Sequence, residues 1–167
     1  MSDSHQAYLS LGSNIEPETN LVKAIELLSN HGQIAKISSA WESQSVGAPG
    51  PNYLNACLLL ITQLSQAELK EQVLLPIETS LGRKRSENRF APRTIDIDII
   101  VFDGESCDDK YWEQAFVVIP LAEIQPHFQN PLHRESVNKT ATRLRQQLWI
   151  EARPNVLNRY SGSRLMP

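Results

Sequence analysis

Two aspartates, Asp96 and Asp98, follow a cluster of five cationic side chains in the sequence. The cations are Arg83, Lys84, Arg85, Arg89 and Arg93. The formal net charge of the chain is -3, so this positive charge is local. A local field of this sign concentrates anions, and guanidinium groups bind phosphate oxygens in pairs. Carboxylates beside such a cluster indicate a polyphosphate ligand with a divalent metal.

The spacing of the two aspartates places them on one face of a predicted strand. Residues 94–102 alternate polar and apolar side chains, as a half-buried strand does. Asp96 and Asp98 would lie about 7 Å apart at a rise of ~3.3 Å per residue, and they repel unless a cation lies between them. Mg²⁺ commonly takes one or two carboxylates and completes its shell with water and phosphate. The alternative is a solvated polar face whose aspartates pair with the nearby arginines.

The opposite face of this strand is predicted to cover the core. Its apolar residues are Ile95, Ile97, Ile99 and Val101. The carboxylate face has no such partner, which is why we expect it to carry the site.

Composition excludes several other classes of protein. At 167 residues with 41% hydrophobic content, the chain has the size of one domain with a proper core. It lacks a basic overall balance and an interleaved aromatic platform, so we expect no nucleic-acid partner. It has no apolar run near 18 residues and begins with a polar segment, so we expect a cytoplasmic protein without a membrane partner. Cys57 and Cys107 are predicted to be free thiols.

The order of predicted elements indicates the fold. Strands are expected at residues 7–11, 34–41, 53–62 and 94–102, with one helix after Asn14 and another after the capping box that begins at Ser65. Pro76 should bend the second helix or be absorbed by local unwinding. Right-handed crossovers fold this βαββαβ order into a ferredoxin-like α+β sheet, with the helices on one face and the active site on the other.

The end of the chain is predicted to add a helix and a tail. Residues 135–150 carry apolar side chains at helical spacing and complete a single domain at 1–150. Residues 151–167 have little apolar area to offset ordering, so we expect a tail that is flexible or docked on a partner.

Four short motifs occur in an order typical of one family. They are Gly12-Ser13-Asn14, Tyr53-Leu54-Asn55, Ile77-Glu78 with Leu81-Gly82-Arg83, and Pro92-Arg93-Thr94-Ile95-Asp96-Ile97-Asp98. Together they resemble the 6-hydroxymethyl-7,8-dihydropterin pyrophosphokinase family of folate synthesis, over roughly residues 7–126.

The resemblance implies transfer of pyrophosphate from ATP to the hydroxymethyl group of the pterin, with release of AMP. It implies that Asp96 and Asp98 hold two Mg²⁺ ions, and that Arg83 and Arg93 stabilise the transferred group. The residues that match ATP-binding positions are Glu78, Arg83, Arg85, Arg93 and Ile99. Small-molecule pterin and ATP are the implied partners.

The resemblance also implies a pterin site. Tyr53 and Phe116 match the two positions that stack on the ring, with Phe116 expected on a strand. Asn55 would read the ring edge with its donor and its acceptor. Ser43 and Val46 match loop positions that complete the recognition. Ordinary core packing is the alternative for the two aromatic residues.

One segment departs from the family pattern. Where the family has a Pro-His pair and then an arginine, residues 104–114 are short and acidic. Either the ATP contacts of this segment are lost, or Lys110, Arg134 or Arg143 substitutes from another direction; the alternative for these three residues is surface solvation. Three interpretations follow: a working pterin pyrophosphokinase, a paralogue with a related pterin or weak transfer, and a pterin- or nucleotide-binding module without catalysis. Neither the oligomeric state nor a protein partner can be read from the sequence.

Overall fold

The computed structural model describes residues 3–45, 47, 49–84 and 91–160. Two of the predicted site residues, Val46 and Arg85, lie outside the described residues. The first part of the chain forms β1 (His5–Ser13), α1 (Pro17–Leu28), β2 (Gln33–Ile37), β3 (Ala40–Ser43), β4 (Tyr53–Thr62), α2 (Gln66–Leu69), the π-helical turn η1 (Lys70–Leu74), α3 (Leu75–Ser80) and β5 (Asp96–Phe102). The second part forms β6 (Glu105–Ser106), the 3-10 helix η2 (Asp109–Glu113), α4 (Ala115–Ile124), β7 (Gln129–Asn130), β8 (Glu135–Ser136), α5 (Val137–Gln147), β9 (Ile150–Arg153) and the 3-10 turn η3 (Asn158–Tyr160).

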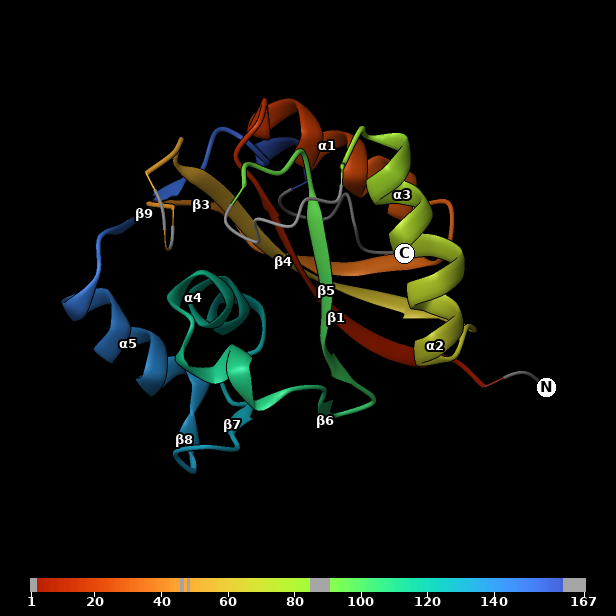
Figure 1. The fold of residues 1–167 in the computed structure, drawn as a ribbon. Coiled ribbons are helices and arrows are strands. Elements are labelled where there is room, and N and C mark those ends of the chain that lie inside the picture. Colours follow the sequence, from red (N-terminus) through yellow and green to blue (C-terminus); the bar gives the residue numbers. More distant parts are fainter. Residues whose placement is uncertain (1–2, 46, 48, 85–90, 161–167) are drawn as a thin grey trace.

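Seven of the strands form one antiparallel sheet in the order β6-β5-β1-β4-β3-β9, with β2 also paired to β4, whereas β7 and β8 pair as a separate two-stranded sheet (Figure 1). This confirms the predicted ferredoxin-like α+β fold. The strand expected at 34–41 is divided into β2 and β3. At the break, the Ser38 hydroxyl accepts a hydrogen bond from the Cys57 backbone N–H at 2.9 Å, so a side chain takes the place of a ladder carbonyl.

One face of the sheet is covered by α1 and by the α2–α3 segment. Apolar residues of these helices pack on the inward side chains of β1, β4 and β5 as one buried cluster. The predicted capping box is present, because Ser65 and Glu68 each accept a hydrogen bond from the other's backbone N–H. Pro76 is accommodated by η1, where the Leu75 N–H bonds to the Lys70 carbonyl five residues earlier. The expected unwinding is therefore confirmed.

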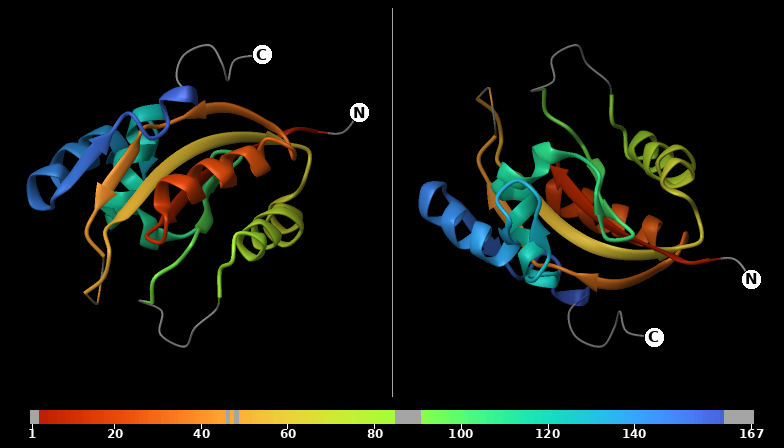
Figure 2. Two further views of the ribbon diagram at one scale, coloured as in Figure 1. Left: turned by 90° about the horizontal axis from the view of Figure 1, so that it is seen from above. Right: turned by 90° about the horizontal axis from the view of Figure 1, so that it is seen from below.

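The other face of the sheet is partly covered by α4 and α5. In Figure 2, α1 lies in front of the sheet in the view from above, and α4 lies in front of it in the view from below. A second buried cluster joins these helices to Tyr8, Leu59 and Val101. The expected position of Val101 was wrong, because the register of β1 against β5 shifts between Tyr8 and Leu9. That bulge leaves Ile100 as an extra residue and turns Val101 to the second face.

The end of the described chain belongs to the sheet. β9 pairs with β3 over residues 150–153, and Leu157 is buried in the first cluster. The prediction of a tail from residue 151 was therefore wrong for residues 151–160, and 161–167 lie outside the described residues. Within the part that the structure describes, no helix is long and apolar enough to span a membrane.

Candidate functional site

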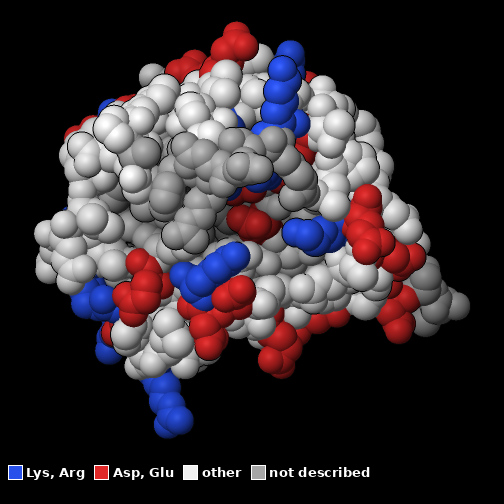
Figure 3. All heavy atoms as spheres, in the orientation of Figure 1, with Lys and Arg blue, Asp and Glu red and all other residues white. Residues whose placement is uncertain are grey.

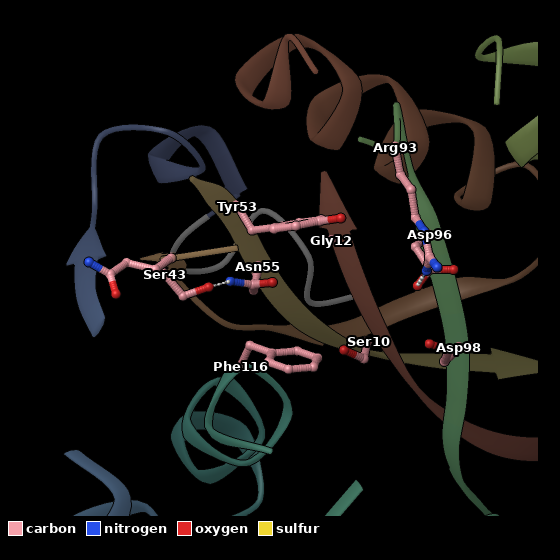
Figure 4. A pocket seen from close by; sticks show the side chains of 10 residues that line it. Ser10, Gly12, Ser43, Tyr53, Asn55, Arg93, Asp96, Asp98 and Phe116 are labelled. Carbon is pink, nitrogen blue, oxygen red and sulfur yellow. Dashed lines mark hydrogen bonds and ion pairs between the residues drawn. The ribbon is translucent and has the colours of Figure 1, made fainter. Parts of the chain in front are cut away.

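A pocket opens on the second face of the sheet, beside α4. Its volume is about 150 Å³, and its lining residues are Ser10, Gly12, Ser43, Gln44, Tyr53, Asn55, Arg93, Asp96, Asp98 and Phe116. Figure 3 shows a hollow on this face with an acidic group at its base and cationic side chains around it. Figure 4 shows how the side chains from β1, β4, β5 and α4 converge on it. The structure thus brings both predicted aspartates and both predicted stacking residues to one cavity.

Asp96 is held by two arginines. Arg83 Nη1 lies 2.7 Å from Asp96 Oδ1, and Arg93 Nη1 lies 3.0 Å from Asp96 Oδ2. All three side chains are partly buried, with 19% to 28% of each exposed. Both arginines predicted to be catalytic therefore meet at one carboxylate at the edge of the pocket.

Glu78 positions one of these arginines. It is 5% exposed, and its Oε2 accepts hydrogen bonds from Arg83 Nη1 and from the Ile97 N–H, each at 2.8 Å. Burial raises the pKa of Glu78, although the Ile97 N–H and Arg83 act in the opposite direction. These contacts join α3 to β5. The contact of Glu78 with ATP stays a prediction.

Asp98 lies on the same face of β5 as Asp96. Burial and the charge of Asp96 raise its pKa to about 6, while Lys110 and Lys70 act to lower it. A buried carboxylate whose ionised form is disfavoured by burial and by a neighbouring carboxylate is a site that a cation would stabilise. In the described chain, no group of three or more histidine, cysteine or acidic residues is placed to hold a metal ion. The aspartate pair would therefore complete a metal shell with water and phosphate oxygens.

Tyr53 and Phe116 face each other across the opposite end of the pocket (Figure 4). Tyr53 begins β4, whereas Phe116 lies in the first turn of α4. The expectation that Phe116 lies on a strand was wrong, because a helix begins at Ala115, directly after the N-cap Gln114, and its apolar residues cover the sheet. The slot between the two rings suits a flat aromatic ligand.

Asn55 lies between the two rings in an orientation fixed by the protein. It is 3% exposed, and its Nδ2 donates to the Trp41 carbonyl at 3.1 Å and to Ser43 Oγ at 2.8 Å. The amide donor that we expected to read the ligand is thus used internally. Its Oδ1 lies next to Gly12, where it can accept a hydrogen bond from a ligand N–H.

Several residues of the site were missed or are placed differently from expectation. Ser10, Gln44 and Lys70 had no predicted role, although Ser10 is a polar interruption of an apolar strand. Ile99 has its side chain in the first core cluster, so only its backbone is available to a nucleotide. Arg143 pairs with Glu135 at 2.9 Å and does not line the pocket.

The expected loop at residues 104–114 is folded against the sheet edge. It contains β6 and η2, and Trp112 is fully buried, with its Nε1 donating to Ser106 Oγ at 2.7 Å. The Cys107 N–H bonds to the Ile100 carbonyl at 3.0 Å. These contacts bring Lys110 close enough to affect Asp98.

The fold and the site define a class of enzyme. A slot for a flat ring opens directly onto aspartates and arginines, which is the arrangement needed to transfer a phosphoryl or pyrophosphoryl group to a ring substituent. The family model described as 7,8-dihydro-6-hydroxymethylpterin-pyrophosphokinase matches residues 8–126. The chain belongs to this family, as its motifs predicted, and it is an enzyme of the pyrophosphokinase class.

Relatives of known name agree with this assignment. The 2-amino-4-hydroxy-6-hydroxymethyldihydropteridine pyrophosphokinase of Synechocystis is 39% identical over 143 residues, which cover 76% of this chain and 70% of the relative. The enzyme of the same name from Bacillus subtilis is 39% identical over 130 residues, covering 71% of this chain and 77% of the relative.

Solved structures support the fold. A Plasmodium falciparum HPPK-DHPS triple variant, solved with pterin and p-hydrobenzoate, superposes with a TM-score of 0.67 at 10% identity. The match covers 88% of this chain but only 45% of that one, so this chain spans less than half of the Plasmodium protein.

Proposed function

We propose that the chain transfers the β,γ-pyrophosphoryl group of ATP to 6-hydroxymethyl-7,8-dihydropterin in an Mg²⁺-dependent reaction that yields AMP. Family membership supports the reaction class, and the relatives' names support the pterin. The observation that best supports this proposal is that Tyr53, Phe116, Asp96 and Asp98 line one cavity. A cytoplasmic location stays a prediction.

The pterin would lie between Tyr53 and Phe116. The Asn55 Oδ1 would accept a hydrogen bond from an N–H on the ring edge, because its Nδ2 is already bonded to Ser43 and Trp41. With that edge at Asn55, the hydroxymethyl group at the far end of the ring would point toward β5, where Figure 4 shows Asp96 and Asp98. The acceptor oxygen would then lie beside Asp96 and Asp98.

The donor set of the site fits Mg²⁺. Asp96 and Asp98 supply hard oxygen ligands, and the remaining positions suit water and phosphate oxygens. Bound Mg²⁺ would neutralise triphosphate charge and lower the barrier to attack. The two-ion stoichiometry is part of this proposal.

In the transfer, the pterin hydroxyl oxygen forms a bond to the β-phosphorus of ATP. The bond from that phosphorus to the oxygen that bridges to the α-phosphate breaks, AMP leaves with this oxygen, and the hydroxyl proton passes to solvent. Arg83 and Arg93 would offset the charge on the transferred group, since both guanidinium groups already lie beside Asp96. Glu78 would act by holding Arg83.

Lys70 and Lys110 would take over part of the triphosphate binding that the family assigns to the missing arginine. Both lie close enough to Asp98 to lower its pKa. They would supply positive charge, but an ammonium group cannot form the bidentate hydrogen bonds to phosphate that a guanidinium group forms. We therefore expect a K70A/K110A double variant to raise the KM for ATP more than the KM for the pterin.

The test is AMP formation from ATP, Mg²⁺ and 6-hydroxymethyl-7,8-dihydropterin, with a D96A/D98A double variant as the comparison. Pterin-dependent AMP release by the wild type, lost in the double variant and after addition of EDTA, is the expected result. Release of ADP instead, or no turnover by a wild type that still binds pterin, would refute the proposed transfer. The latter outcome would favour a binding module whose residues 104–114 no longer serve catalysis.

A further inference from the structure

Asn14, directly after β1, makes three hydrogen bonds across the chain. It is only 4% exposed, so its amide needs partners inside the protein. Its backbone N–H donates to the Arg93 carbonyl at 3.1 Å, and its Oδ1 accepts from the Arg93 N–H at 2.8 Å. Two bonds between one pair of residues fix the Arg93 backbone from both sides.

The third bond of Asn14 reaches the pterin side of the pocket. Its Nδ2 donates to the Pro51 carbonyl at 3.3 Å. Pro51 lies two residues before Tyr53, where β4 begins. One amide thus links the end of β1, the segment that carries Arg93 and the segment that leads into Tyr53. Asn14 does not itself line the pocket.

The backbone at Arg93 has little regular structure to hold it. Residues 91–95 belong to neither helix nor strand, and β5 begins at Asp96. The Arg93 guanidinium nevertheless has to stay within reach of Asp96, from which it lies 3.0 Å away. Because a displacement of about 1 Å can cost a catalytic group much of its effect, the anchor of this backbone matters for turnover.

We propose that Asn14 is a positioning residue that holds Arg93 for transfer and couples it to the Tyr53 end of the ring slot. Asn14 would touch neither substrate. This inference rests on the proposed function, in which Arg93 stabilises the transferred group. A purely structural role would lower stability without a selective effect on turnover, and the two roles can be separated.

Two variants of Asn14 remove different sets of its side-chain hydrogen bonds. Asn14→Ala removes the acceptor for the Arg93 N–H and the donor to Pro51, whereas Asn14→Asp keeps the acceptor and loses the donor. Asn130→Ala is the matched control. Asn130 is fully buried and donates to the Trp112 carbonyl and Thr140 Oγ1, away from the pocket.

The first readout is hydrogen exchange of the Arg93 amide, which does not depend on activity. Asn14→Ala should speed this exchange by about 10-fold or more, while Asn14→Asp and Asn130→Ala should leave it near the wild-type rate. The second readout is the split between kcat and KM. For Asn14→Ala we expect kcat to fall by roughly 10- to 100-fold. For Asn14→Asp we expect mainly a rise of about 3- to 10-fold in the KM for the pterin, through the lost bond to Pro51.

Several outcomes would overturn the inference. One is an unchanged exchange rate for the Arg93 amide in Asn14→Ala. Another is a loss of kcat in Asn14→Ala no larger than in Asn130→Ala at equal loss of thermal stability. If the wild type transfers no pyrophosphate, the proposed function fails. The exchange measurement still decides whether Asn14 holds Arg93.

Discussion

Arg83 Nη1 lies 2.7 Å from Asp96 Oδ1, so an arginine contacts the oxygen that we propose as a metal ligand. Arg93 contacts the other oxygen of the same carboxylate at 3.0 Å. A bound metal ion would therefore compete with the two guanidinium groups for Asp96. Binding of the nucleotide would resolve this competition, because its phosphates offer both the metal and the arginines new partners.

Removal of Arg83 should separate metal binding from turnover. In Arg83→Ala, Asp96 loses one competing cation, and we expect Mg²⁺ to bind about 3- to 10-fold more tightly in the absence of nucleotide. The kcat should fall by roughly 100- to 1,000-fold, because the transferred group loses a charged donor. Titration calorimetry and AMP formation measure the two effects. Arg143→Ala, which removes an arginine outside the pocket, should change neither, and weaker Mg²⁺ binding in Arg83→Ala would contradict the competition.

Substitution of Glu78 should show that its charge serves Arg83 more than it serves stability. Burial raises the pKa of Glu78, so its ionised form is costly in the folded chain. Glu78→Gln retains an acceptor for the Ile97 N–H, and we expect little change in the free energy of unfolding together with a fall in kcat of about 10-fold.

Glu78→Leu provides the matched comparison. It leaves the buried Ile97 N–H without its acceptor and removes one of the two carboxylates that Arg83 contacts, and should cost about 1–3 kcal/mol of unfolding free energy. Urea denaturation of the three proteins gives the comparison. Equal losses of stability in Glu78→Gln and Glu78→Leu would show that the charge itself stabilises the fold.

The parts of this molecule that follow local rules were predictable from the sequence. Alternation along β5 placed Asp96 and Asp98 on one face, and the spacing of Ser65 and Glu68 gave the capping box. The bulge that turns Val101 depends on register against β1, which no local pattern contains. The bond from Asn14 to Arg93 spans 79 positions, so only the folded chain reveals it.

The secondary structure around Phe116 is a second feature that could not be predicted from the sequence. The family resemblance placed it in the ring slot, and the structure brings it there from α4 instead of from a strand. A side chain can reach the same point in space from either kind of element. The family resemblance therefore predicted that Phe116 lines the pocket. It did not predict that Phe116 lies in a helix, because that depends on how α4 packs against β4.

Gly12 should be needed for the ring site because it leaves space. A Cβ at this position would lie 3.3 Å from Asn55 Oδ1 and 3.7 Å from Tyr53 Cδ1. Gly12→Ala would crowd the acceptor that we propose reads the pterin edge, and the Kd for the pterin should rise roughly 5- to 100-fold. The Kd for ATP with Mg²⁺ should stay within about twofold of wild type, since the atoms that a Cβ at Gly12 would meet within 4 Å belong to Asn55 and Tyr53.

The control for Gly12 is Gly50→Ala. A Cβ there meets Ser45 at an ordinary 3.6 Å, so we expect the pterin to bind as it does to wild type. Fluorescence titration with the pterin measures its Kd for wild type, Gly12→Ala and Gly50→Ala. Wild-type pterin affinity in Gly12→Ala would remove Asn55 Oδ1 from the proposed recognition.

Acid should weaken the attachment of β9 through Glu42. The Glu42 carboxylate on β3 accepts from Asn52 Nδ2 at 2.8 Å and from Arg153 Nε on β9 at 2.9 Å. The hydrogen bond from Asn52, followed by that from Arg153, lowers the pKa of Glu42. A carboxyl whose folded pKa is lowered stabilises the chain above its unfolded pKa of about 4.3, and this stabilisation is lost as the pH falls through the folded pKa.

Glu42→Gln should therefore be less stable than wild type at neutral pH, and the difference should shrink as the pH falls below about 4. Urea denaturation at a series of pH values measures this, with Glu71→Gln on the exposed surface of η1 as the control. Hydrogen exchange in β9 should rise in Glu42→Gln at neutral pH, because Arg153 loses its charged partner on β3. A stability difference that persists unchanged at pH 3 would mean that the carboxylate charge does not hold β9 to the sheet.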